Sequence, residues 1–265
     1  MSLRATLLLT LLLPLAACNK DAPAPTAETA PATTEAATPA APATDAPATA
    51  ATPAAPVAES ADIPPAASPD VPVGPAPVAG IDYEEIAGGQ PFEPGSGKIE
   101  VVEVFSYTCP HCAAFEPLVR AWRARQPADV KFTPVAGPFG GNPEPFARAY
   151  YAAESLGLLG KTHEAMFRAV HLDHKIDMHD ANAETISAWY AGYGADAAQF
   201  ASTMGSFAVD AKFKRALQFM QRSAVDSSPS VVVDGKYKIK GKTLEDTLRI
   251  ATHLVAQERA ARSGG

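Results

Sequence analysis

The stretch VEVFSYTCPHCAAFEP, Val102–Pro117, joins an apolar run to two cysteines and then to a segment that suits a helix. The longer run KIEVVEVFSY, residues 98–107, is rich in β-branched residues and almost continuously apolar. It therefore predicts a strand that is buried on both faces. Pro110 suits the first position of a helix, which we expect to reach about Gln126. Pro117 is expected to kink this helix because it lacks an N–H group.

The two cysteines lie where the strand gives way to the helix. Cys109 is expected at the helix N-cap, and Cys112 one turn further on. The unpaired N–H groups of the first turn would then point at Cys109, stabilise its thiolate and lower its pKa. Pro110 fixes the turn, and His111 adds a nearby cation when it is charged. This placement favours a redox-active disulfide.

Other kinds of cysteine site fit the pair less well. A zinc site needs four ligands, and Cys18 is the only other cysteine in the chain. A c-type haem needs a histidine directly after the second cysteine, where this chain has Ala113. A purely structural disulfide would close a very small loop and would constrain the unfolded chain little. We therefore expect no metal and no cofactor at this site.

Further elements are expected on both sides of the motif. Strand signals occur at residues 83–86, 129–136, 231–233 and 237–239, and Asp234-Gly235 makes a hairpin turn between the last two. Between Pro143 and about Ala224 only helical periods occur. They mark four faces: Phe146, Tyr150 and Ala153; Met166, Phe167 and Val170; Ile186, Trp189 and Tyr190, closed by Gly194; and Val209, Phe213, Leu217 and Met220. A last helix begins at Thr243, which with Asp246 resembles a capping box.

The order is thus β-α-β, a block of helices, and β-β-α, which predicts an α/β fold. We expect a thioredoxin-like domain made of residues 81–141 and 223–265, with an inserted helical domain over residues 142–222. A disordered Ala/Pro/Thr-rich tether precedes it.

Residues 81–262 resemble the DsbA family of periplasmic thiol:disulfide oxidoreductases. The resemblance is carried by FSYTCPHC (105–112), by the helical block and by SSPSVVVDGKY (227–237). It implies that Cys109 is the exposed nucleophile and Cys112 the buried resolving thiol. It also implies that Pro229 is the cis-proline that faces the cysteines and contributes to substrate binding; the alternative is a trans-proline that opens an edge strand.

The chain departs from the family at one position and matches it at two others. The residue before the cis-proline is usually β-branched, and here it is Ser228, whose backbone can still pair with substrate. This departure leaves substrate preference and redox potential open. Glu103, in the middle of the strand, and Glu116, seven residues after Cys109, match family acids that tune proton flow to the thiols. Both could instead be surface carboxylates.

A histidine-rich segment follows in the helical block. HLDHKIDMH, residues 171–179, gathers His171, His174 and His179. Their spacings do not share one helix face, so we expect surface polar residues there, with a metal site as the alternative.

The N-terminus has the pattern of a secretory signal. Residues 1–17 combine Arg4, a short apolar run and two small residues, and the run is too short for an ordinary membrane span. LAAC, residues 15–18, resembles the lipobox of bacterial lipoproteins, so we expect a lipid on Cys18; ordinary cleavage with a free thiol is the alternative. Residues 18–80 hold no Phe, Tyr or Trp and are expected to stay disordered. Asn19 favours the outer over the inner membrane.

These features together predict a lipid-anchored periplasmic enzyme that donates the Cys109–Cys112 disulfide to reduced, unfolded secreted proteins. A membrane reoxidase of the DsbB type would restore it. The formal net charge of −7 does not favour nucleic acid as a partner. We expect a monomer, because the region where bacterial isomerases of this fold carry a dimerisation domain is a tether here. The alternatives are a disulfide reductase or isomerase, and a non-enzymatic metal- or peptide-binding lipoprotein.

Overall fold

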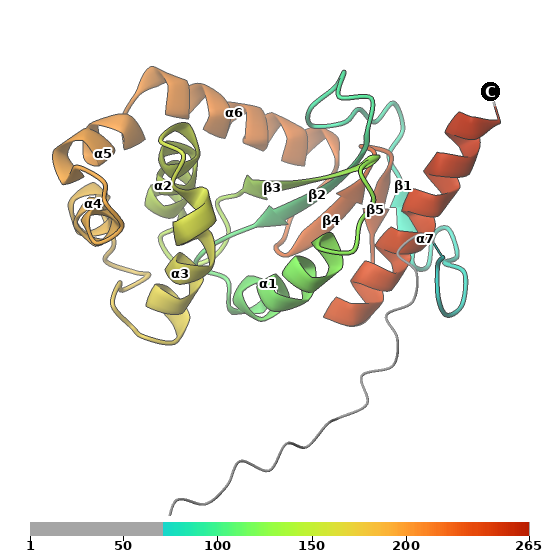
Figure 1. Ribbon diagram of the computed structural model, residues 1–265, viewed down its shortest axis with the longest axis horizontal. Coiled ribbons are helices and arrows are strands. Elements are labelled where there is room, and N and C mark those ends of the chain that lie inside the picture. The colour runs from blue at the N-terminus through green and yellow to red at the C-terminus, as the bar shows by residue number, and fades with distance from the viewer. Residues whose placement is uncertain (1–70, 265) are drawn as a thin grey trace, which may run out of the picture. The chain divides into compact units, whose positions relative to one another are not determined.

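The computed structural model describes residues 71–264, so the signal segment, Cys18 and most of the tether lie outside the described residues. The expectation of disorder was wrong for residues 71–80, because the carbonyls of Val73 and Pro75 lie within hydrogen-bond distance of His253 and Arg249 on the last helix. One sheet runs through this part of the chain in the order β1-β5-β4-β2-β3 (Figure 1). β2 is parallel to β3 and antiparallel to β4, and β5 is antiparallel to both β4 and β1. The strands are β1 (Tyr83–Glu85), β2 (Ile99–Phe105), β3 (Val130–Ala136), β4 (Ser230–Val233) and β5 (Tyr237–Ile239).

β2 is the central strand that carries the chain into the cysteine motif. All seven of its residues are buried. Ile99 and Val101 belong to a core that also holds side chains of α1 (Pro110–Arg123) and α7 (Leu244–Ser263). Val102 and Val104 belong to a second core with the other helices. The expected strand with two buried faces is therefore confirmed.

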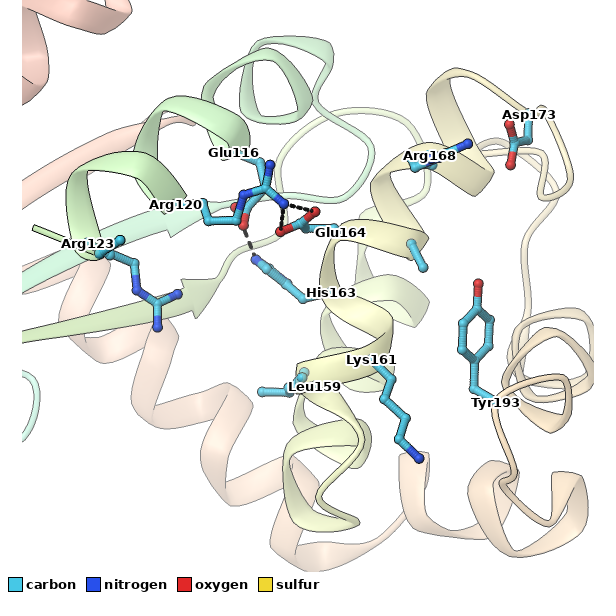
Figure 2. A pocket seen from close by; sticks show the side chains of 13 residues that line it. Glu116, Arg120, Arg123, Leu159, Lys161, His163, Glu164, Arg168, Asp173 and Tyr193 are labelled. Carbon is cyan, nitrogen blue, oxygen red and sulfur yellow. Dashed lines mark hydrogen bonds and ion pairs between the residues drawn. The ribbon is translucent and has the colours of Figure 1, made fainter. Parts of the chain in front are cut away.

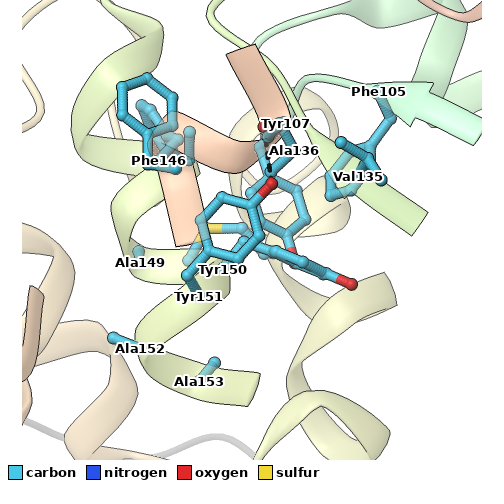
Figure 3. Close-up of a cluster of buried hydrophobic side chains, with 14 of the residues drawn as sticks. Phe105, Tyr107, Val135, Ala136, Phe146, Ala149, Tyr150, Tyr151, Ala152 and Ala153 are labelled. Carbon is cyan, nitrogen blue, oxygen red and sulfur yellow. Dashed lines mark hydrogen bonds between the residues drawn. The ribbon is translucent and has the colours of Figure 1, made fainter. Parts of the chain in front are cut away.

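The second core is built largely from helices between β3 and β4. Tyr150 and Tyr151 of α2 lie against the ends of β2 and β3, and the hydroxyl of Tyr151 donates to the carbonyl of Ala136 (3.0 Å; Figure 3). Phe105 and Tyr107 contribute rings to the same cluster. The helices are α2 (Pro143–Ser155), α3 (Leu159–His171), α4 (Ala183–Ala191), α5 (Ala197–Met204) and α6 (Phe207–Arg222). This cluster ties the helices to the strand that precedes Cys109.

The helical block differs in detail from the sequence prediction. The prediction of four helices was wrong, because α5 is an additional helix that buries only Phe200 and Met204. α4 ends at Ala191 with Gly192 as its C-cap, so Gly194 does not close it. Leu217 was expected in the core, yet 38% of it is exposed.

The two helices that cover the other face begin as predicted. α1 starts at Pro110 and continues through Pro117 to Arg123, slightly short of the expected end. At the start of α7 the hydroxyl of Thr243 accepts a hydrogen bond from the backbone of Asp246 (3.1 Å). In a capping box the side chain of Asp246 would accept a bond from the N–H of Thr243. Here it accepts from the N–H of Lys242. Over residues 71–264, no helix is both long and apolar enough to cross a membrane.

Candidate active site

The two cysteines lie at the N-terminus of α1, directly after β2. Cys109 is the N-cap residue, with an extended backbone (φ −92°, ψ 116°), and Pro110 begins the helix. The carbonyl of Cys109 accepts a bond from the N–H of Ala113 (3.2 Å), so the helix starts immediately after the thiol. Cys109 is partly exposed, whereas Cys112 is completely buried, and both are free thiols. A substrate can therefore reach the first sulfur but not the second.

The surroundings push the two thiol pKa values in opposite directions. A hydrogen bond from the Cys112 thiol is the largest influence on Cys109. Together with the backbone N–H groups of Cys112 and His111 and the side chain of Ser228, it lowers the Cys109 pKa to about 5, against a smaller effect of burial. The same Cys109–Cys112 bond, with burial and the charge of Cys109, raises the pKa of Cys112 far above its ordinary value. Reduction of a disulfide here would leave a thiolate at Cys109 and a thiol at Cys112.

The loop before β4 faces the exposed thiol. The peptide bond between Ser228 and Pro229 is cis, and the Cys109 thiol donates to the carbonyl of Ser228 (3.3 Å). Next to it, a hollow of about 300 Å³ is lined by His111, Pro229 and Leu244 among others. His111 is exposed and Pro229 half-buried. The structure thus brings Cys109, Cys112, Pro110, His111, Ser228 and Pro229 into one place.

Glu103 lies beneath the cysteines in the middle of β2. Its partners across the sheet are Pro134 of β3 and Val231 of β4, and only 2% of the residue is exposed. Burial, then the charge of Glu116 and that of Cys109, raise the Glu103 pKa well above its ordinary value, while Arg123 opposes the shift. Glu103 is not a surface carboxylate, and it is held toward its neutral form.

Glu116 is also buried, on the face of α1 that meets α3. Its carboxylate lies 3.3 Å from Nε2 of His163, and Nδ1 of the same ring lies 2.8 Å from the hydroxyl of Tyr107. Figure 2 shows His163 on α3 pointing toward Glu116, beside the ion pair of Arg120 and Glu164. An open pocket of about 800 Å³ adjoins this group.

Sequence reasoning missed His163 and Tyr107. Tyr107 stood in the quoted motif, where its apolar neighbours marked it only as a strand residue. His163 is separated from it by 56 residues and carries no local signal. Their contact exists only because α3 packs against α1 and the end of β2.

The histidine-rich segment is not uniformly at the surface. His174 and His179 are exposed, but His171 is half-buried, and its Nε2 lies 2.8 Å from the carbonyl of Tyr107. The surface prediction was therefore wrong for His171. Within the part of the chain that the structure describes, no three His, Cys, Asp or Glu side chains form a group able to hold a metal ion.

Comparisons with known proteins agree on one family. The thioredoxin family model matches residues 96–251. The thiol:disulfide interchange protein DsbA of Pseudomonas aeruginosa is 38% identical over 186 residues, which cover 69% of this chain and 86% of that protein. The protein of the same name from Azotobacter vinelandii is 38% identical over 168 residues, covering 62% of this chain and 77% of the relative.

Solved structures give the same result. The crystal structure of oxidoreductase DsbA from Xylella fastidiosa superimposes with a TM-score of 0.68 at 45% identity, and covers 69% of this chain and 98% of that chain. The structure of Pseudomonas aeruginosa DsbA superimposes with a TM-score of 0.65 at 36% identity, covering 71% and 97%.

Proposed function

Because the chain belongs to the DsbA family of thiol:disulfide oxidoreductases, we propose that Cys109 and Cys112 are its redox-active pair. The observation that carries this assignment is the unequal placement of the two thiols, because Cys109 is partly exposed at the N-cap of α1 while Cys112 is buried in its first turn. The Cys109 pKa is lowered to about 5, while that of the buried Cys112 is raised. A thiolate that is stable at neutral pH is a good leaving group and a poor reductant. The pair is therefore suited to donating a disulfide.

The proposed reaction begins with the disulfide form. A substrate thiolate attacks the sulfur of Cys109, the bond to Cys112 breaks, and a mixed disulfide joins substrate and enzyme. Cys112 takes up a proton, because burial disfavours its thiolate. A second substrate thiol then attacks the substrate sulfur and displaces Cys109 as a thiolate. The substrate leaves oxidised by two electrons, and the enzyme leaves as a dithiol.

Five neighbours support this chemistry in our proposal. Pro110 fixes the start of α1, and His111 lies exposed beside the thiol. Ser228 and Pro229 bind the substrate backbone, which is consistent with their position against Cys109. Glu103 supplies the proton that Cys112 takes up, which is consistent with its buried, neutral-leaning carboxyl.

The cellular setting follows from the family and from the N-terminal sequence. The substrates are reduced proteins in the periplasm, and a membrane reoxidase of the DsbB type regenerates the disulfide. We place the enzyme at the membrane through a lipid on Cys18, with the outer membrane favoured by Asn19, and as a monomer on the tether that precedes residue 71. We also propose that residues 142–222 form a helical domain inserted into the thioredoxin-like domain.

A trapping experiment tests the assignment. In Cys112→Ser the thiol of Cys109 has no internal partner, so an adduct should accumulate when a one-cysteine peptide is supplied as its mixed disulfide with thionitrobenzoate. The Cys109 thiolate attacks the peptide sulfur and thionitrobenzoate leaves, and the peptide has no second thiol that could release Cys109. Mass spectrometry should place the peptide on Cys109. Cys109→Ser is the matched variant and should form no adduct, because Cys112 is buried. Adducts on neither variant would contradict the proposed mechanism.

A further inference from the structure

His163 links three elements around the thiols. It lies on α3, and its two ring nitrogens reach Tyr107 after β2 (2.8 Å) and Glu116 on α1 (3.3 Å). Tyr107 is buried and stands two residues before Cys109, and its ring packs against that of His163 with centroids 5.4 Å apart. The imidazole is thus fixed at both ends by side chains that belong to the active-site segment.

The Glu116–His163 pair stands between a buried carboxyl and solvent. On its inner side, Glu116 is close enough to Glu103 for its charge to affect that group. On its outer side, Glu116 and His163 both line the open pocket between α1 and α3 (Figure 2). Their side chains are 10% and 14% exposed, so each is largely buried but still reaches solvent. Glu103 itself is buried and has no such contact with solvent.

We propose that His163 is a positioning residue that orients Glu116 and passes protons between the pocket and the buried Glu103. This inference rests on the proposed function, because it supplies the proton that Cys112 needs when the disulfide opens. Histidine suits the role, because imidazole gains and loses a proton between about pH 5 and pH 8.

The protons and electrons balance along this route. Attack of the substrate thiolate on Cys109 breaks the disulfide, and the electron pair of that bond goes to the sulfur of Cys112. Glu103 gives its proton to this sulfur and becomes a carboxylate. Protonated His163 gives a proton to the Glu116 carboxylate, and Glu116 passes it to Glu103. Neutral His163 then takes up a proton from the solvent in the pocket, which restores the starting state.

Among the charged groups around His163, Glu116 is the one that forms an ion pair with the ring. The charged or titratable side chains that face it are Tyr107 at the end of β2, Glu116, Arg120 and Arg123 on α1, Lys131 on β3, and Tyr150 and Glu154 on α2. On its own helix Glu164 is paired with Arg120, and Lys131 is paired with Glu93. Over residues 71–264, Glu116 is the only carboxylate within ion-pair distance of the ring.

The test compares reduction rates of the oxidised full chain by a reduced two-cysteine peptide between about pH 5 and pH 8. We expect His163→Gln to lower the rate by about 3- to 10-fold at pH 7, less than the ~100-fold of a group that transfers the proton directly. The ratio of wild-type to variant rate should change with pH, which a purely structural role would not produce. His179→Gln changes an exposed histidine that makes no contact with His163, Glu116 or Tyr107; it is the control and should keep the wild-type profile.

A second background isolates the route through Glu103. In Glu103→Gln the group that gives the proton to Cys112 is missing, so His163 has no route to the sulfur. Adding His163→Gln should therefore lower the rate no further. Equal effects of His163→Gln in both backgrounds, or a ratio that is constant with pH, would overturn the proposal. Tyr107→Phe removes only the hydroxyl that contacts Nδ1 of His163. It should change the dependence of the rate on pH in the same direction, and it replaces His163→Gln in the test if that variant does not fold. Failure of wild type to react at Cys109 would instead contradict the proposed function.

Discussion

The side chain of Ser228 is the residue-scale feature that separates this site from its family pattern. The backbone carbonyl of Ser228 accepts from the Cys109 thiol at 3.3 Å, which favours the neutral thiol, whereas the Ser228 side chain contributes to the lowered Cys109 pKa. A β-branched apolar residue at this position could not offer that hydroxyl. Ser228 therefore helps to hold the thiolate.

The first prediction removes that hydroxyl. Ser228→Ala should raise the Cys109 pKa from about 5 by up to about one unit, since one unit corresponds to ~1.4 kcal/mol, the size of one hydrogen bond to a charged group. Thiolate absorbance followed against pH measures it. Ser227→Ala changes the neighbouring exposed serine, whose hydroxyl bonds to Asp226, and should leave the titration unchanged. An unaltered curve for Ser228→Ala would show that its hydroxyl does not act on the thiolate.

The second prediction concerns the buried carboxyl of Glu103. Burial is the main reason why the pKa of Glu103 is higher in the folded protein than the value of about 4.5 in the unfolded chain. As pH rises above about 4.5, the unfolded chain therefore loses the proton first, and the free energy of unfolding falls. Glu103→Gln should increase the free energy of unfolding at pH 7, because the neutral amide carries no penalty for a buried carboxyl that the unfolded chain holds ionised. The gain should disappear below about pH 4.5, where the wild-type group is protonated in both states. Urea unfolding at both pH values measures this, and a gain that is the same at both would contradict the assignment.

At the scale of elements, much of the site followed from the sequence because its local signals are strong. The apolar run of β2 and the proline after Cys109 fix the strand, the junction and the start of α1. α5 was missed because it is short and presents only Phe200 and Met204 to the core. Pro229 could be assigned only by resemblance, since it lies 120 residues beyond Cys109. His163 could not be assigned at all, because its role depends on how α3 meets α1.

The buried side chain of Glu100 connects neighbouring elements and holds the segment before β2 in place. Its carboxylate accepts from the N–H of Phe92 (2.6 Å), from the N–H of Glu93 (3.2 Å) and from the hydroxyl of Thr133 on β3 (2.8 Å). Glu100 is fully buried, so no water can replace these bonds. The side chain therefore joins three backbone segments at the edge of the sheet.

The third prediction tests this contact. Glu100→Ala should lower the free energy of unfolding by about 3 to 5 kcal/mol, because it leaves buried donors without an acceptor. Chemical denaturation gives the value. Glu85→Ala, on the exposed side of β1, is the control and should change stability by less than about 0.5 kcal/mol. A loss for Glu100→Ala no larger than that of the control would contradict the structural role.

At the scale of the whole molecule, the account combines a redox domain with an anchor at Cys18. The anchor rests on the N-terminal sequence alone, since Cys18 lies outside the described residues. The fourth prediction is that Cys18→Ser moves the enzyme from the membrane fraction to the soluble periplasm and leaves its oxidation of a reduced peptide unchanged. Immunoblots of fractionated cells measure this. A variant that still sediments with membranes would place the anchor elsewhere.

The account's central claim is that the folded protein stabilises the Cys109 thiolate and is therefore an oxidant. Its folded pKa of about 5 lies below the reference value of 9.0, so the stabilisation is full above about pH 9 and is lost as pH falls through about 5. At pH 7 part of it remains, on the order of 1 to 2 kcal/mol once screening by solvent around the half-exposed thiol is allowed for. Only the reduced form carries this thiolate.

The most direct test compares thermal unfolding of the dithiol and disulfide forms, in a Cys18→Ser background, from pH 8 down to pH 4. The account predicts that the dithiol form melts at the higher temperature at pH 7 and that the gap shrinks steadily as pH falls toward about 5. A disulfide form that melts higher at pH 7, or a gap that does not depend on pH, would contradict it.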